Sequence, residues 1–169
     1  LRKKANSLPD EIAPGLDRLG VMLPYTPFYH LILRRLGRPV IMTSGNPSGQ
    51  PQCIENQETR ERLASIADFG CLHDRDIANR IDDSVVRVDL DRERVLRRAR
   101  GYAPQPLTLP KGFSDQTELL ALGSEQKNPF CFVKDGRAVV SQHMGDLEDL
   151  TTNTDASKYL DVYQNLFDY

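Results

Sequence analysis

Residues 37–49 read GRPVIMTSGNPSG, and this stretch decides how the rest of the chain is interpreted. The apolar run 40–42 predicts a short buried strand, which ends in a turn rich in hydroxyl groups and glycine. Gly45 and Gly49 allow a ligand to approach the main chain closely. Serine and asparagine side chains donate and accept hydrogen bonds, so they suit phosphate, carboxylate or carbonyl oxygens. The pattern is typical of a ligand-binding turn after a strand, although an ordinary solvent-facing loop would have the same composition.

The residues before this turn predict a βαβ-type unit. Short apolar strands are expected at 20–23 and 39–43, on either side of a helix over 26–36. Thr26 suits the N-cap of that helix, and Pro27 suits its first position.

The residues after the turn predict a second helix, a short strand and a hairpin. Asn56 can cap a helix that runs through Ile66, and 69–72 is apolar enough for a strand. The alternating, β-branched run 85–90 predicts a strand that pairs with 94–98 through a tight turn at 91–93.

A break in the pattern divides the chain into two expected domains, 1–112 and 113–169. Residues 101–112 contain three prolines and no periodicity, which is typical of a linker. A β-meander is expected beyond it, with an Asp-Gly hairpin turn, and then a closing helix capped by Thr154 or Asp155. The expected elements are strands at 118–122, 130–133 and 138–141 and a helix at 155–169, with Leu160, Tyr163 and Phe167 on one face.

Composition narrows the class of protein. Hydrophobic residues make up 39% and charged residues 27% of the 169 residues, as in ordinary globular domains. No apolar run approaches the ~20 residues of a membrane helix. The three cysteines are scattered, which favours reduced thiols and a cytoplasmic protein. Residues 1–112 carry 18 Lys/Arg and 14 Asp/Glu, whereas 113–169 carry 4 and 10, so the first part would attract an anionic ligand.

Two polar clusters could bind phosphate or metal. Arg97, Arg98 and Arg100 could grip phosphoryl oxygens, or they could form a solvated strand face. Strand alternation would place Arg98 and Arg100 on one side, but it does not decide which arginine faces a ligand. Asp82 and Asp83 could hold Mg²⁺ beside a nucleotide, or they could simply begin the next strand.

Four motifs resemble the HypF family of carbamoyltransferases. VIMTSGNPSG (40–49) resembles the signature of YrdC-type nucleotide-binding domains. HDRDIANRIDDSVVR (73–87) and LRRARGYAP (96–104) resemble the HypF version of that domain. Residues 120–150 resemble the opening of the next, TsaD-like domain. The resemblance implies an α/β (α+β) fold: a YrdC-like twisted mixed sheet with helices, then the first β-meander and helix of an actin/hexokinase-like domain.

The resemblance also implies which residues bind nucleotide. It places a binding site for carbamoyl-adenylate on hydroxyl, carboxamide and guanidinium groups, with no covalent nucleophile and no metal ligand within this chain. In the second domain, the turn at 123–128 would approach nucleotide phosphates through Lys127 and Asn128, unless it is an ordinary hairpin. The implied ligands in the first domain are Thr43, Ser44, Asn46, Ser48, Arg75, Arg80, Ser84, Arg98 and Arg100.

The family's chemistry implies ATP and Mg²⁺ as cofactors. Carbamate from carbamoyl phosphate would be adenylated by ATP and then passed to the C-terminal cysteine of HypE, on the way to the cyanide ligand of hydrogenase iron. The resemblance also places zinc and the TsaD-type metal outside these residues. We therefore expect the chain to be a fragment without carbamoyl-transfer activity by itself.

Two other functions fit parts of the sequence. TSGN permits a threonylcarbamoyl-adenylate synthase for tRNA modification, although 73–87 and the TsaD-like part favour HypF. A non-catalytic RNA-binding module is the second alternative. The small positive excess and the lack of interleaved aromatic and basic residues make nucleic acid a poor expected partner.

Overall fold

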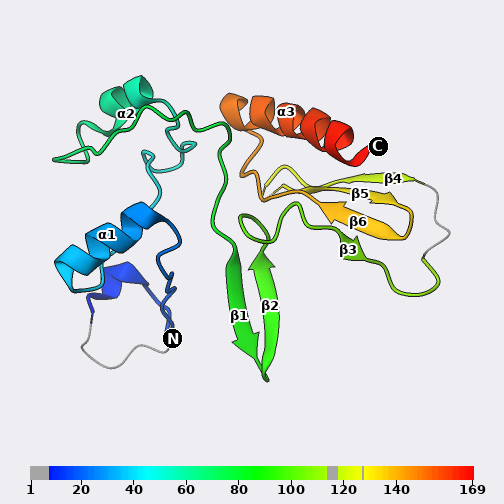
Figure 1. Ribbon diagram of the computed structural model, residues 1–169, viewed down its shortest axis with the longest axis horizontal. Coiled ribbons are helices and arrows are strands. Elements are labelled where there is room, and N and C mark those ends of the chain that lie inside the picture. The colour runs from blue at the N-terminus through cyan, green and yellow to red at the C-terminus, as the bar shows by residue number, and fades with distance from the viewer. Residues whose placement is uncertain (1–7, 114–117, 127) are drawn as a thin grey trace. The chain divides into compact units, whose positions relative to one another are not determined.

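The computed structural model describes residues 8–113, 118–126 and 128–169 (Figure 1). Its internal contacts divide the chain into two units, Leu1–Thr43 and Ser44–Tyr169. Each unit is described separately below.

The first unit contains a short 3-10 helix, η1 (Asp10–Ile12), and the helix α1 (Pro27–Leu36). The hydroxyl of Thr26 accepts a 3.2 Å hydrogen bond from the Tyr29 N–H, and Pro27 occupies the first turn. Gly37 ends the helix with a positive φ of 62°, where its N–H donates to the Leu33 carbonyl at 2.9 Å. The predicted helix and its cap are confirmed.

The two strands predicted around α1 are wrong, because neither 20–23 nor 39–43 is a strand among the described residues. Their apolar side chains are largely exposed, with 80% of Leu23 and 74% of Ile41 accessible. A strand needs a hydrogen-bonded neighbour as well as an apolar run, and no ladder is described for either segment.

The second unit begins with the polar turn and the helix α2 (Asn56–Leu63). Glu55, not Asn56, is the N-cap, and the Glu58 carboxylate reaches back to accept a 3.1 Å hydrogen bond from the Ile54 N–H. The helix ends before Ile66. The strand predicted at 69–72 is wrong, and Phe69 is 95% exposed there.

The predicted hairpin is confirmed as β1 (Val85–Asp89) paired with β2 (Arg92–Arg97). Leu90 and Asp91 form its two-residue turn, with φ of 53° and 59°. Positive φ at both positions is the conformation that matches the twist of a tight hairpin. The turn therefore lies one residue earlier than predicted, and the paired strands lie side by side in Figure 1.

A four-stranded antiparallel sheet follows, in the order β3-β6-β5-β4. The predicted meander is confirmed, and Asp135 and Gly136 make its hairpin turn with φ of 50° and 70°. The first strand lies in the segment predicted as a linker, where two residues pair with Ala138 and Arg137. The strands are β3 (Leu107–Thr108), β4 (Leu119–Leu122), β5 (Phe130–Lys134) and β6 (Arg137–Val140).

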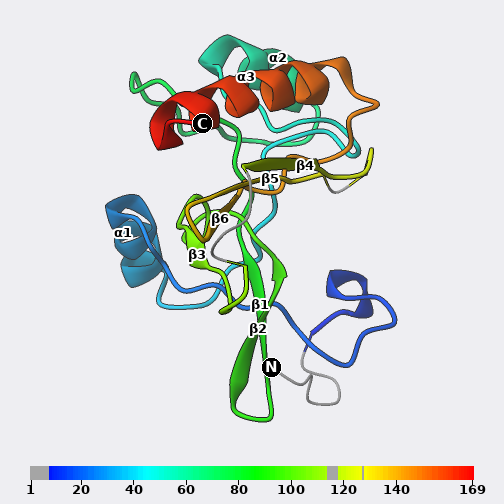
Figure 2. The same cartoon turned by 90° about the vertical axis from the view of Figure 1, so that its right-hand side faces the viewer.

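The helix α3 (Leu150–Phe167) covers one face of this sheet in Figures 1 and 2. The predicted caps were wrong, because the helix begins five residues earlier. Asp149 is the N-cap, and its carboxylate accepts hydrogen bonds from Thr151 N–H at 2.8 Å and Thr152 N–H at 3.0 Å. Asp149 is favoured as the N-cap over Thr154 and Asp155, because its carboxylate satisfies two N–H groups of the first turn.

The core of the second unit forms where α3 meets the sheet. Its buried side chains are at most 6% exposed, and they are Phe130, Phe132, Val139, Tyr159 and Tyr163. Leu160 and Phe167 pack against them, so the predicted apolar face is confirmed. The Tyr163 hydroxyl donates a 2.7 Å hydrogen bond to the side chain of buried Gln142, which satisfies both polar groups inside the core.

Helices and antiparallel ladders together confirm the predicted α+β class, although the sheet expected to be mixed is antiparallel in its described ladders. Within the described ranges, no helix combines the length and apolar character needed to cross a bilayer.

Candidate functional site

The turn after residue 43 is closed by its own polar groups. The Asn46 Nδ2 group donates to the carbonyls of Pro47 at 3.0 Å and Gln50 at 2.8 Å. The Cys53 N–H donates to the Gly45 carbonyl at 2.9 Å. Asn46 Oδ1 is buried and has no hydrogen-bond partner among the described residues. The closed turn therefore holds one buried acceptor that no described protein group satisfies.

The other predicted ligands near this turn are exposed side chains. Ser44 and Ser48 flank Asn46 in the second unit, and Arg75 lies in the segment after α2. Thr43 belongs to the first unit. Their role as ligands remains a prediction.

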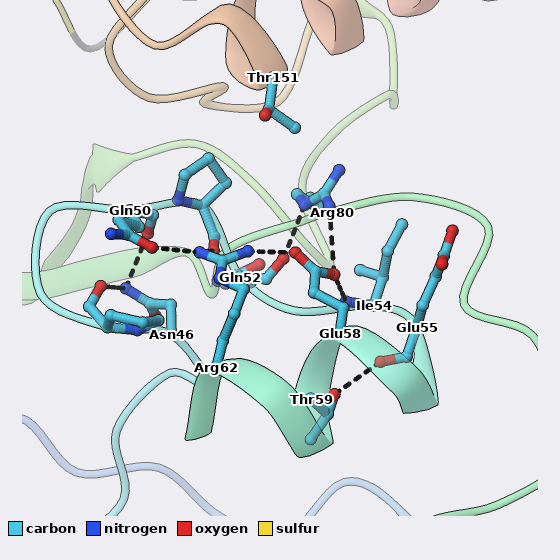
Figure 3. A network of polar contacts seen from close by, with 12 residues as sticks. Asn46, Gln50, Gln52, Ile54, Glu55, Glu58, Thr59, Arg62, Arg80 and Thr151 are labelled. Carbon is cyan, nitrogen blue, oxygen red and sulfur yellow. Dashed lines mark hydrogen bonds and ion pairs between the residues drawn. The ribbon is translucent and has the colours of Figure 1, made fainter. Parts of the chain in front are cut away.

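Gln52 links the turn to the segment before β1 (Figure 3). Its carbonyl accepts a 2.7 Å hydrogen bond from Arg80 Nε, and its side-chain amide donates to Asp82 Oδ1 at 2.8 Å. Because Cys53 is bonded to Gly45, these two contacts fix the position at which the turn returns to the protein.

Arg80 was predicted to bind nucleotide, but the structure shows its guanidinium between three protein groups. Besides Gln52, it contacts Asp155 Oδ2 of α3 at 2.9 Å and Glu58 Oε2 of α2 at 3.7 Å. The Arg80 side chain is only 18% exposed. Figure 3 shows it between Glu58 and Thr151 at the start of α3. A planar guanidinium with several donors is suited to joining three elements in this way.

Glu58 and Arg62 stabilise the same loop from α2. Arg62 is paired with Glu58 and donates from NH2 to Gln50 Oε1 at 2.7 Å and the Pro51 carbonyl at 3.2 Å. Burial is the largest influence on the Glu58 carboxyl and raises its pKa. The hydrogen bonds from Ile54 N–H and Arg62 outweigh burial, so the pKa is lowered overall.

Asp82 joins the loop to His143, which follows β6, and to Arg97 at the end of β2. His143 Nδ1 lies 2.9 Å from Asp82 Oδ2, and Arg97 NH1 lies 3.7 Å from the same oxygen. The hydrogen bond with His143 is the main cause that lowers the pKa of Asp82 below its ordinary value of 3.8, against the effect of burial. Arg97 and Gln52 lower it further, so Asp82 is held as a carboxylate.

We expect this pairing to make stability depend on acid. The folded-state pKa of Asp82 is lowered, so its contribution is fully present above pH 3.8 and is lost as pH falls through the folded value. The difference in free energy of unfolding between the wild type and Asp82→Asn should therefore shrink below about pH 4. Urea denaturation from pH 7 to 2.5 measures it. A difference that persists unchanged to the lowest pH would contradict the linkage.

The hydroxyl of Ser84 is engaged at the end of the hairpin. Ser84 Oγ donates to the Arg100 carbonyl at 3.0 Å and accepts from the Ala99 N–H at 2.8 Å. It therefore fixes the strand end that carries the arginines, and a role as ligand remains a prediction.

The three arginines do not alternate as predicted, because β2 ends at Arg97. Arg97 donates from Nε to the Asp83 carbonyl at 2.9 Å, and Arg100 pairs with the Asp83 carboxylate. Arg98 instead donates at 2.7 Å to the carbonyls of Tyr102 and Gln105. Arg97 and Arg100 thus share a partner, whereas Arg98 supports the loop that follows.

The candidate phosphate loop of the second domain is only partly described. Lys127 lies outside the described residues. Asn128 is 7% exposed, its N–H donates to the Gly145 carbonyl at 3.4 Å, and its carbonyl accepts from Met144 N–H at 3.3 Å. A Cβ on Gly123 would lie 2.5 Å from Asn128 Oδ1, so this tight approach requires glycine.

The carboxylates of the site do not fit a Mg²⁺ cage. Asp82 is occupied by Gln52, His143 and Arg97, and Asp83 is paired with Arg100. Across the residues that the structure describes, no three His, Cys, Asp or Glu side chains gather as metal ligands.

Several residues of this network were not predicted as functional. The network connects the turn to α2 through Glu58 and Arg62, and to α3 through Asp155. It also joins Gln52, by way of Asp82, to His143 in the segment between β6 and α3. Asp155 lies 75 residues from Arg80 and His143 lies 61 residues from Asp82, so no local pattern indicates these two contacts.

Comparison with known proteins identifies two families in order along the chain. Residues 1–99 match the Sua5/YciO/YrdC family model, described as telomere recombination, and residues 114–169 match the HypF Kae1-like domain. The carbamoyltransferase HypF of Rhodobacter capsulatus is 51% identical over 86% of this chain and 20% of its own length. That of Synechocystis sp. is 45% identical over 99% of this chain and 22% of its own length.

Solved structures agree with the sequence matches. A crystal structure of full-length HypF in the phosphate- and nucleotide-bound form has a TM-score of 0.86 and 44% identity, covering 98% of this chain and 26% of that chain. The structure of T. kodakarensis HypF has a TM-score of 0.85 and 36% identity, covering 97% and 21%. The chain thus spans about a fifth of the length of the curated relatives it matches. It belongs to the Sua5/YciO/YrdC family, in the version of that family found among the HypF carbamoyltransferase homologues.

Proposed function

We propose that this chain forms part of a HypF-type carbamoyltransferase. In the reaction of such an enzyme, carbamate derived from carbamoyl phosphate attacks ATP, which gives carbamoyl-adenylate and releases pyrophosphate. The carbamoyl group is then transferred to the C-terminal cysteine of HypE, and AMP leaves. The supporting observation is the pair of family matches in HypF order, together with relatives named carbamoyltransferase HypF at 45–51% identity.

Residues 44–50 form the turn that Asn46 closes, called the Asn46 turn below, and we assign this turn to binding the acyl group. The buried, unpartnered Oδ1 of Asn46 is an acceptor, so it suits the amino group of a carbamoyl moiety better than a phosphate oxygen, which donates nothing. The neighbouring hydroxyls of Ser44 and Ser48 can donate to oxygens of the acyl phosphate anhydride. These groups would orient the carbamate oxygen toward the α-phosphate, and the reaction needs no covalent nucleophile.

Charge for the nucleotide is assigned to the end of the hairpin. Arg100 is an exposed arginine whose side chain is 40% accessible, and the Ser84 hydroxyl fixes its carbonyl. Arg98 and the exposed Arg75 are further candidates, whereas Arg80 is already held by three protein groups. Gln52 and Asp82 connect the turn to Arg97, so both clusters belong to one polar network. A related HypF structure in a nucleotide-bound form supports a nucleotide as the ligand.

The match of residues 114–169 to a HypF Kae1-like domain weighs against a threonylcarbamoyl-adenylate synthase for tRNA modification.

A chimera tests this function directly. We expect that Rhodobacter capsulatus HypF, with its matching fifth replaced by this chain, forms carbamoyl-adenylate and carbamoylates the terminal cysteine of HypE. Mass spectrometry of HypE measures transfer, and ATP–pyrophosphate exchange measures adenylation. The control is the same chimera made with the native segment. A folded chimera that forms threonylcarbamoyl-adenylate but no carbamoyl-adenylate would contradict the proposal.

A further inference from the structure

The segment 78–82 belongs to the part of the chain that matches the Sua5/YciO/YrdC family, and it contacts the part that matches the Kae1-like domain. Three of its residues are contacted by the part that matches the Kae1-like domain. Lys158 Nζ reaches the Ala78 carbonyl at 3.5 Å, the Tyr159 hydroxyl donates to the Arg80 carbonyl at 3.0 Å, and His143 contacts Asp82. These contacts fall on alternate residues of the segment, so the second part holds it at three points.

One face of α3 makes most of these contacts. Asp155, Lys158 and Tyr159 are spaced by three and four residues, which places them on the same face of a helix. Asp155 binds the Arg80 guanidinium, and Tyr159 is also a member of the sheet core at 4% exposure. The position of α3 on its sheet therefore fixes where Arg80 can lie.

The side chains of Arg80 and Asp82 also contact the residues that close the Asn46 turn. Arg80 Nε donates to the Gln52 carbonyl, and Asp82 accepts from the Gln52 amide. Cys53, the next residue, bonds to the Gly45 carbonyl within the turn. An unbroken series of contacts runs from α3 and His143 through Arg80 and Asp82 to Gln52 and the turn.

We propose that Arg80 and Asp82 are positioning residues, through which α3 and His143 of the second part hold the Asn46 turn in its binding geometry. This assignment gives Arg80 a role different from the direct nucleotide contact predicted from sequence. It rests on the proposed function for the identity of the ligand, but the mechanical coupling is measurable without any ligand. Arg80 and Asp82 both contact Gln52 near the turn, and they contact Asp155 and His143 in the second part. The coupling can therefore be tested by substituting residues far from the turn.

Hydrogen exchange of the whole chain, followed by mass spectrometry, tests the coupling. The amide of Cys53 reports closure of the turn, and amides of β5 and β6 report whether the fold is intact. Asp155→Asn removes the charge that holds Arg80 but leaves every residue of the turn unchanged. We expect exchange at Cys53 to rise about tenfold, which corresponds to about 1.4 kcal/mol, with sheet amides unchanged. Asp161→Asn, on an exposed part of α3, is the matched control and should leave Cys53 unaffected.

Arg80→Lys separates positioning from direct phosphate binding. Lysine keeps the positive charge but lacks the planar set of separate N–H donors with which Arg80 reaches Gln52 from Nε and Asp155 from NH1. We expect it to raise exchange at Cys53 as Asp155→Asn does. Normal exchange at Cys53 in both variants would overturn the proposal, because closure of the turn would then be independent of the contact between Arg80 and Asp155.

Repeating the measurements with ATP and Mg²⁺ tests the consequence for binding. ATP should slow exchange at 44–50 in the wild type, and Asp155→Asn should need about tenfold more ATP for the same protection. An unchanged ATP requirement in Asp155→Asn would overturn the positioning role. If ATP protects nothing in the wild type, the proposed nucleotide site is contradicted, and the ATP-free rates still decide whether the coupling exists.

Discussion

Phe132→Ala is expected to destabilise the second unit by about 3–5 kcal/mol, the usual cost of removing a buried phenylalanine. Phe132 is 3% exposed between α3 and the sheet. Its ring contacts that of Phe130 at 5.5 Å and stacks on that of Tyr169 at 4.6 Å, so truncation leaves a cavity and removes two aromatic contacts. Urea denaturation of the chain, followed by circular dichroism, measures the change.

Leu122→Ala is the matched control for this prediction. Leu122 also lies in the four-stranded sheet, but it is 70% exposed. Its substitution should change the free energy of unfolding by less than about 0.5 kcal/mol. Equal effects of the two substitutions would show that the core has been placed wrongly.

Asn46→Ala is expected to reduce adenylation by about 10- to 100-fold in the chimera with Rhodobacter capsulatus HypF, because losing the acceptor for the carbamoyl amino group costs about 1–3 kcal/mol. The substitution removes the buried Oδ1 acceptor and both hydrogen bonds by which Nδ2 closes the turn. ATP–pyrophosphate exchange measures the rate. Because Asn46 lies in a surface turn, the free energy of unfolding should change far less than in Phe132→Ala.

Gln57→Ala provides the control for the Asn46 experiment. Gln57 lies on an exposed face of α2, where its side-chain amide donates to Glu61 Oε1 at 2.6 Å. The variant should keep the full adenylation rate. If Asn46→Ala also keeps it, the turn does not bind the acyl group and its polar residues serve the loop alone.

Local signals predicted much of the fold. Thr26 and Pro27 specify the start of α1, and the Asp-Gly pair specifies the turn between β5 and β6, because a cap or tight turn depends on adjacent residues. The strand predicted at 39–43 failed for the converse reason. An apolar run is only a candidate strand until another segment pairs with it, and that information is not local.

The candidate site shows the same division. The composition of the TSGN segment predicted a polar turn, and the structure has a turn there that Asn46 closes. The partners of Arg80 were not predictable, because an isolated arginine in a polar segment fits a phosphate ligand and a structural ion pair equally well. Only the fold brings Asp155 to it across 75 residues.

The distance between Gln52 and Asp155 along the chain has a consequence during synthesis on the ribosome. About a hundred residues must be added after Gln52 before Asp155 exists, which takes about 5–20 s at ordinary elongation rates. During that interval the nascent turn lacks the α3 contact that holds Arg80. The order of translation therefore delays completion of this loop until α3 has left the exit tunnel and docked.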